Sequence, residues 1–222
     1  MFIGHFSVAL AAGASRKSPS LGTLFVASQL IDLGFFSLML VGVERMRFLD
    51  GATVMNPMDL YFMPYTHGLI GALVWALGFG AVIWLLTRRT VAAAIGTAVV
   101  FSHWFLDFLT HRPDLAMPDG SKAGLGLWNY PAIEMPLEIG ITLAALWLYA
   151  RATEPKRAAG RWSLLWLLLV LLTMQAINWF GPVAPEAGPS VAVEALVAYV
   201  VAISLAIWAA STRRFKGGAG AV

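Results

Sequence analysis

Long apolar stretches alternate with short polar segments along almost the whole chain. Six of these stretches are long enough to cross a bilayer, which takes about 20 apolar residues. They cover residues 21–43, 65–87, 91–111, 132–150, 162–181 and 191–211. Because lipid offers the backbone N–H and C=O groups no hydrogen-bond partner, each stretch is predicted to be a helix. The pattern therefore predicts an all-α, polytopic membrane bundle with six transmembrane helices.

Residues 2–14 form a further apolar stretch that is too short for a full span. No basic residue precedes this stretch, Arg16 and Lys17 follow it, and His5 lies within it. This pattern differs from that of a cleaved signal peptide. We therefore expect a retained short helix, partial or re-entrant, before the six spans.

The composition fits one integral membrane domain over residues 1–222. Of all residues, 59% are hydrophobic and 12% are charged, whereas a soluble domain carries about 25% charged residues. Residues 1–150 hold the polar motifs, and residues 151–222 are expected to add two scaffold helices and a tail. Cysteine is absent from the sequence, which excludes a disulfide framework, a thiolate metal site and a cysteine nucleophile.

Basic residues are distributed unevenly between the two ends of the predicted spans. One end receives eleven: Arg16, Lys17, Arg88, Arg89, Arg151, Lys156, Arg157, Arg161, Arg213, Arg214 and Lys216. The other end receives four: Arg45, Arg47, Arg112 and Lys122. The positive-inside rule places the larger set in the cytoplasm, so the loops 44–64, 112–131 and 182–190 face outward. The net charge of +3 thus indicates topology, and we expect membrane lipids rather than nucleic acid as partners.

Ionisable residues gather in the stretch SHWFLDFLTHRPD, residues 102–114. His103, Asp107 and His111 are spaced i, i+4 and i+8, which places them on one face of a helix. At 1.5 Å per residue, Asp32 and His103 lie about 16 and 18 Å along two outward-running helices, and so reach a similar depth. Ionisable side chains inside a membrane are costly and usually mark a functional site.

Two further histidines, His5 and His67, are predicted in the same outer half of the bundle. A single histidine is more often a packing residue than a ligand, but three histidines and two aspartates on four segments would all need partners in hydrocarbon. One divalent cation supplies that partner, which favours a metal site over a purely structural polar network. Without thiolate ligands Zn²⁺ is preferred, and Mn²⁺ or Fe²⁺ also fits. One ion with an open water position and two ions sharing a carboxylate are both compatible with the pattern.

The order of these residues resembles that of the bacterial membrane-bound metal-dependent hydrolases, which is in turn similar to that of zinc-dependent phospholipases C. The resemblance covers residues 1–150 and is carried by five positions: His5, Asp32 in QLID, His67 in THG, and His103 and Asp107 in SHxxxD. It implies a multi-helical protein of the bacterial inner membrane. It also implies that these five residues are the ligands of a catalytic metal.

The hydrolase hypothesis assigns roles to residues near the predicted metal site. Asp107 (if it is not a ligand), Asp114 or Glu134 is expected to act as general base. At the outer rim, Arg112 is suited to bidentate capture of a phosphate, and His111 is expected to contact substrate beside it. A site that opens near the outer leaflet favours a lipid or a lipid-linked (phospho)ester as substrate.

Two other classes of function use the same residues. A metal or proton transporter or channel needs polar residues that continue to both faces, yet the cytoplasmic halves of the spans are almost purely apolar. A non-catalytic membrane scaffold with a structural metal needs a closed coordination sphere. The one-sided distribution of ionisable residues therefore argues against transport, and the scaffold stays an alternative to the hydrolase.

The charge asymmetry yields a test of topology. We expect the chain end after Val222 to be cytoplasmic and residue 1 to lie toward the outer side. A reporter that is active only in the cytoplasm, fused after Val222, should therefore be active. Activity of a periplasmic reporter at the same position would reverse the orientation.

Overall fold

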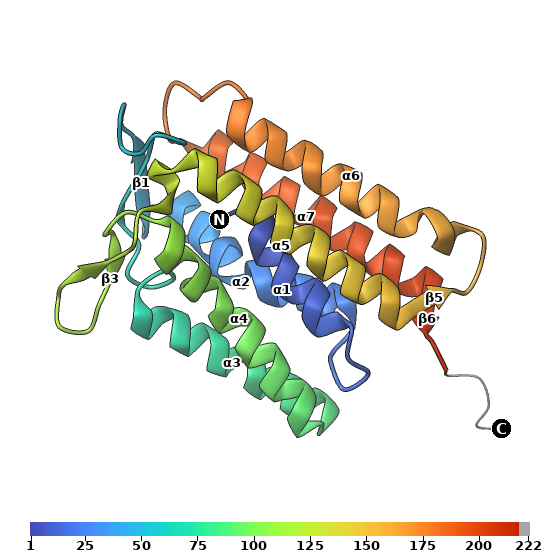
Figure 1. Ribbon diagram of the computed structural model, residues 1–222. Coiled ribbons are helices and arrows are strands. Elements are labelled where there is room, and N and C mark those ends of the chain that lie inside the picture. The colour runs from blue at the N-terminus through green and yellow to red at the C-terminus, as the bar shows by residue number, and fades with distance from the viewer. Residues whose placement is uncertain (218–222) are drawn as a thin grey trace.

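The computed structural model describes residues 1–217, and it confirms the predicted all-α bundle (Figure 1). Six helices are long and apolar enough to cross a membrane, so the protein is a multi-pass membrane protein. They are α2 (Leu21–Leu40), α3 (Leu69–Thr87), α4 (Thr90–Thr110), α5 (Pro131–Ala152), α6 (Ala159–Phe180) and α7 (Pro189–Thr212). The long helices run side by side along one common direction (Figure 1).

The predicted short N-terminal helix is present as α1 (Ile3–Gly13), and it lies in the interior of the bundle (Figure 1). It packs against α2, α4 and α5, and eight of its 11 residues are buried. Its first turn is capped from a distant helix, because the N–H groups of Phe2 and Gly4 donate to Glu138 Oε1 of α5 at 2.6 and 2.9 Å. The short helix therefore fills the bundle centre and presents its side chains to three neighbours.

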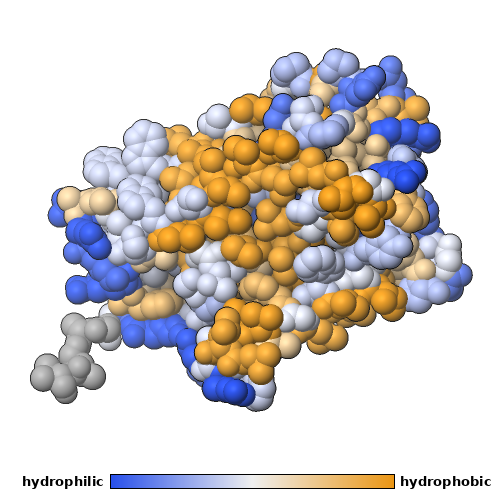
Figure 2. Space-filling model, turned by 180° about the vertical axis from the view of Figure 1, so that it is seen from behind, coloured by the Kyte–Doolittle hydropathy of each residue, from blue (hydrophilic) through white to orange (hydrophobic). Residues whose placement is uncertain are grey.

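The surface of the bundle has the polarity of a membrane protein. Figure 2 shows hydrophobic residues over the middle of one face and hydrophilic residues toward both ends. Large apolar side chains such as Val74, Leu86, Trp147 and Phe180 are exposed on the long helices. A soluble protein would bury most of these side chains, whereas lipid is a favourable solvent for them.

Short strands, which the sequence did not predict, occur at both ends of the bundle. At one end β1 (Arg45–Phe48) pairs antiparallel with β2 (Met58–Phe62), and β3 (Leu115–Ala116) pairs with β4 (Lys122–Ala123). A single-turn 3-10 helix, η1 (Leu127–Asn129), follows β4. We call this end the hairpin end. At the opposite end β5 (Thr153–Pro155) pairs with β6 (Arg213–Phe215) and ties α5 to the end of α7.

The start of α3 differs from the prediction. The predicted span 65–87 begins too early, because α3 starts at Leu69 and His67 lies in the preceding turn. The N–H groups of His67 and Gly68 both donate to the Met63 carbonyl oxygen, at 3.1 and 3.2 Å. A Cβ atom at residue 68 would lie 2.5 Å from a backbone oxygen of the same turn, so this close turn requires glycine. The turn fixes the direction in which His67 enters the bundle.

Candidate metal centre

Four histidines and two aspartates from four segments converge near the hairpin end of the bundle. His103 and Asp107 lie one turn apart on α4 and point to the same region, as their spacing predicts. His5 reaches it from α1, Asp32 from α2 and His67 from the turn before α3. His111 follows α4 directly. All of these side chains are buried except that of Asp32, which is 16% exposed.

The carboxylate of Asp107 lies at the middle of the convergence. Its Oδ1 atom is 3.1 Å from Nε2 of His5 and 3.4 Å from Nε2 of His111. Its Oδ2 atom is 3.1 Å from Nε2 of His103 and 3.5 Å from Nε2 of His67. Each carboxylate oxygen thus faces a different pair of imidazole nitrogens.

Asp32 provides a second carboxylate close to two of these histidines, His67 and His103. Its Oδ1 atom lies 3.3 Å from Nε2 of His67 and 3.5 Å from Nε2 of His103. Two ligands of one ion, with bonds of about 2.0–2.1 Å at a tetrahedral angle, lie about 3.3 Å apart. The observed separations are therefore compatible with atoms that share a cation.

Two groups of three residues can hold a metal ion, and they share His103. One group is His5, His103 and Asp107, and the other is Asp32, His67 and His103. A single ion between the groups and two neighbouring ions are both compatible with this geometry. The five residues in the two groups are those that the sequence predicted as ligands.

Hydrogen bonds on the far side of the imidazole rings determine which nitrogen carries the proton. Nδ1 of His103 lies 2.8 Å from the carbonyl oxygen of Ser28, which can only accept a hydrogen bond. Nδ1 of His103 is therefore the protonated nitrogen, and Nε2 of the neutral ring presents a lone pair to the carboxylates. Metal-binding histidines are normally oriented in this way.

Two facing atoms at the middle of the cluster have no hydrogen-bond partner in the described part of the chain. Among residues 1–217, neither Nε2 of His103 nor Oδ2 of Asp107 has a hydrogen-bond partner, although both atoms are buried. The two atoms are 3.1 Å apart, and both are acceptors when the histidine is neutral. Buried acceptors that face one another are strongly unfavourable unless a proton or a metal ion lies between them. The donor set of imidazole nitrogen and carboxylate oxygen therefore fits Zn²⁺, as well as Mn²⁺ or Fe²⁺.

His111 is not a rim residue as the sequence suggested, because it is only 3% exposed. Its Nδ1 atom lies 3.0 Å from Oδ1 of Asp114, and its Nε2 atom faces Asp107. Burial lowers the pKa of the His111 imidazole, but the carboxylates of Asp107 and Asp114 outweigh this effect and raise its pKa above the ordinary value. Asp114 thus lies behind His111 and orients it.

Arg112 is engaged with the hairpin at this end of the bundle. Its guanidinium bonds Oδ1 of Asp59 in β2, and Oδ2 of the same aspartate accepts a bond from Arg47 in β1 at 2.7 Å. Arg112 is not among the residues that line the adjacent cavity. The structure therefore gives Arg112 a role in joining the end of α4 to the hairpin, and capture of a phosphate stays a prediction.

Glu134 and Glu138 occupy successive turns of α5, and only Glu138 lines the cavity. Glu138 accepts the bonds that cap α1, and its Oε2 also accepts one from Gln175 Nε2 at 3.1 Å. Glu134 is fully buried, and neither of its oxygens has a hydrogen-bond partner within residues 1–217. Glu134 also belongs to neither candidate metal group. A direct role in catalysis for Glu134 stays a prediction.

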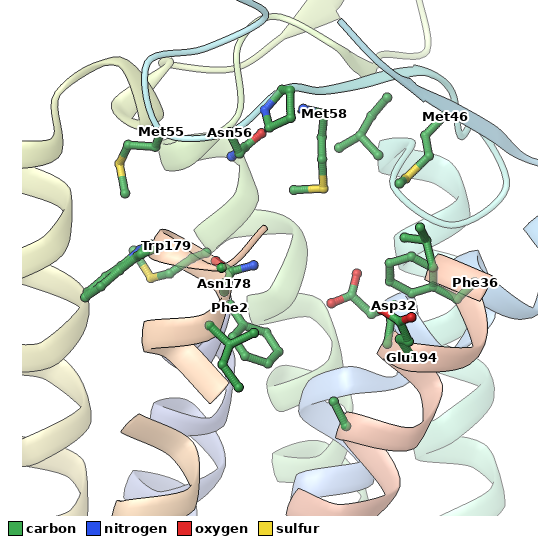
Figure 3. Close-up of a pocket in the computed structure, with 18 of the residues that line it drawn as sticks. Phe2, Asp32, Phe36, Met46, Met55, Asn56, Met58, Asn178, Trp179 and Glu194 are labelled. Carbon is green, nitrogen blue, oxygen red and sulfur yellow. Dashed lines mark hydrogen bonds between the residues drawn. The ribbon is translucent and has the colours of Figure 1, made fainter. Parts of the chain in front are cut away.

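A cavity of about 380 Å³ leads to the cluster (Figure 3). Asp32, His67, Asp107 and His111 line part of it. Figure 3 shows Met46, Met55 and Met58 of the β1–β2 segment on one side and the Asp32 carboxylate pointing into the space below them. Side chains of α6 and α7, such as Trp179 and Glu194, form another part of the wall (Figure 3). The cavity is therefore mostly apolar, with ionisable groups concentrated near the candidate ligands.

Tyr199 of α7 is a site residue that the sequence analysis missed. Its hydroxyl donates to Oδ2 of Asp32 at 2.9 Å, so it holds the aspartate with Oδ1 turned toward His67 and His103. The available signal was its position in the middle of a span, since tyrosine normally lies at the membrane interface. The helices after residue 150 thus contribute to the site and are not scaffold alone.

Comparison of the chain with known protein families, curated proteins and solved structures gave no match. The resemblance to the bacterial membrane-bound metal-dependent hydrolases accordingly stays a prediction.

The central position of Asp107 predicts the effect of removing its charge. Asp107→Asn keeps the shape of the side chain but removes a charge that the cation needs, so we expect bound metal to fall several-fold while the protein still inserts. His111→Gln should retain most of the metal, because the five predicted ligands are intact. Metal stoichiometry of the two purified variants and the wild type measures both effects. Equal metal content in wild type and Asp107→Asn would exclude Asp107 as a ligand.

Proposed function

We propose that this protein is a membrane-embedded metal-dependent hydrolase. The observation that carries the proposal is the convergence of imidazole lone pairs on two carboxylates, above all on Asp107, at one side of a mostly apolar cavity. We assign Zn²⁺ as the preferred ion. A divalent cation bound there would lower the pKa of a coordinated water and polarise an ester oxygen.

The residues around the cation have separate tasks in this proposal. His5, Asp32, His67, His103 and Asp107 hold the ion. Tyr199 fixes the orientation of Asp32 through its hydroxyl. His111 lines the cavity and is oriented by Asp114, so it is placed to accept a proton from the attacking water. Asp114 acts through His111 rather than directly, because the imidazole lies between it and the cavity.

The cavity walls support a lipid or a lipid-linked (phospho)ester as substrate. Phe2, Phe35 and Phe36 lie near the cluster, and Met46, Met55, Met58 and Met174 surround the space above it. Methionine is unbranched and flexible, so it adapts to chains of irregular shape. An amphiphile would place its apolar chain against these side chains and its ester bond against the ion.

The distribution of ionisable groups supports hydrolysis over transport. Between the cluster and the end of the bundle opposite the hairpins, α2, α3 and α4 carry no Asp, Glu, His, Lys or Arg inside the helix. A transported ion would meet no ionisable side chain of these three helices there. With the orientation expected from the basic residues, the site opens toward the periplasmic half of a bacterial inner membrane.

Filling the cavity should separate substrate binding from metal binding. Met174 of α6 lines the cavity, whereas Leu169 of the same helix is 43% exposed on the lipid-facing surface. We expect Met174→Trp to lower hydrolysis of long-chain ester or phosphoester lipids about tenfold, with metal content unchanged, because it occupies the space for the chain. Leu169→Trp is the matched control and should retain activity.

The measurement is a hydrolysis screen on neutral and phosphate-containing lipid esters in detergent or nanodiscs, with metal content determined on the same samples. Metal-loaded wild-type protein that cleaves no ester in the screen would contradict the proposed function. Equal activity of Met174→Trp and Leu169→Trp would contradict the proposed position of the substrate's apolar chain in the cavity.

A further inference from the structure

Glu44 is a buried carboxylate outside the candidate ligand set. It lies between α2 and β1 and is 0% exposed, and it forms no ion pair within residues 1–217. Its Oε1 atom accepts bonds from the N–H groups of Tyr65 and Thr66, at 2.8 and 3.0 Å. Its Oε2 atom accepts a bond from the Thr66 hydroxyl at 2.6 Å. Burial of a charged carboxylate is costly, so such a residue usually has a cation beside it or a functional role.

The Thr66 hydroxyl links Glu44 to the metal centre. Because its single proton is donated to Glu44, Thr66 Oγ1 can only accept a bond from Nδ1 of His67, which lies 2.9 Å away. Nδ1 of His67 then carries the proton, and Nε2 of the neutral ring has a free lone pair. That lone pair faces Oδ1 of Asp32 at 3.3 Å and Oδ2 of Asp107 at 3.5 Å.

We propose that Glu44 is a positioning residue of the metal centre, which acts through Thr66 to hold His67 in the tautomer and orientation that bind a divalent cation. The proposal rests on the metal centre described above. It adds two residues at the hairpin end, Glu44 and Thr66, to the set of functional residues. Hydrogen bonds link Glu44 to Thr66 and Thr66 to the candidate ligand His67. Carboxylate–histidine–metal arrangements strengthen the ligand and fix its direction.

A purely structural role for Glu44 makes a different prediction. Its two bonds to backbone N–H groups would by themselves hold the turn that precedes α3. In that case the Thr66 hydroxyl would be dispensable for metal binding. Thr66→Val removes the hydroxyl but keeps the branched shape and the backbone N–H, whereas Thr66→Ser keeps the hydroxyl.

Glu44→Gln is expected to reverse the direction of the hydrogen bonds that run from His67 through Thr66 to residue 44. The amide –NH₂ donates where the carboxylate Oε2 accepts, so the Thr66 hydroxyl would turn to donate to His67 Nδ1. The proton of His67 would then lie on Nε2, which faces the ion. We therefore expect weaker metal binding even though glutamine has nearly the same shape as glutamate.

The experiment measures Zn²⁺ affinity by chelator competition on full-length wild type and variants in detergent, together with the absorption spectrum of bound Co²⁺. We expect Thr66→Val and Glu44→Gln to weaken Zn²⁺ binding about 10- to 100-fold and to alter the Co²⁺ spectrum. Thr66→Ser should restore wild-type affinity. Thr212→Val is the matched control, because Thr212 is a buried threonine at the opposite end of the bundle.

The outcomes separate this proposal from the proposed function. Wild-type affinity and spectrum in Thr66→Val would overturn the role of Glu44 while leaving the metal centre in place. A Thr66→Ser variant as weak as Thr66→Val would also overturn it, because the hydroxyl would then not be the relevant group. Wild-type protein that binds neither Zn²⁺ nor Co²⁺ would overturn the metal centre and this proposal together.

Discussion

The Asp107 carboxylate is the group on which the arrangement of the bundle depends. It is buried between α1, α4 and the turn before α3, and imidazole nitrogens from all three segments lie within 3.5 Å of its oxygens. Burying an ion without compensation costs several kcal/mol, so these partners have to be brought to it. This requirement accounts for the central position of α1, because a helix on the bundle surface would not carry His5 to Asp107.

The two ends of the bundle differ because only one end has to position polar groups. At the hairpin end, three features hold side chains that face the cluster: the turn at Gly68, the hydrogen bonds that link Glu44 to His67, and the bond that His111 donates to Asp114. At the opposite end, the β5–β6 pair and the buried Arg213, which bonds the carbonyl oxygens of Thr153 and Gly160, hold helix ends together. The polar contacts at the hairpin end therefore orient side chains, whereas those at the opposite end join the backbone of neighbouring helix ends.

The sequence predicts those parts of the site that depend on local periodicity. The spacing of His103 and Asp107 places both on one face of α4 whatever the rest of the chain does. Hydropathy likewise predicts all six long helices and the short α1. Glu44, Tyr199 and the burial of His111 depend instead on how loops and distant helices pack, and no periodicity encodes that. Glu44 in particular is the first residue of a loop that the sequence places on the outer side, and its burial against the turn before α3 depends on how that loop packs.

The low polarity around the cluster connects the fold to the proposed chemistry. Electrostatic interactions are stronger where water is excluded, so a cation held by Asp32 and Asp107 would act more strongly on a substrate oxygen than it would in solvent. The cavity reaches these residues, and most of its wall is apolar. A freely soluble ester gains little by leaving water for such a space, whereas an amphiphile gains burial of its chain. The same exclusion of water that makes the buried carboxylates costly therefore favours a substrate drawn from the membrane.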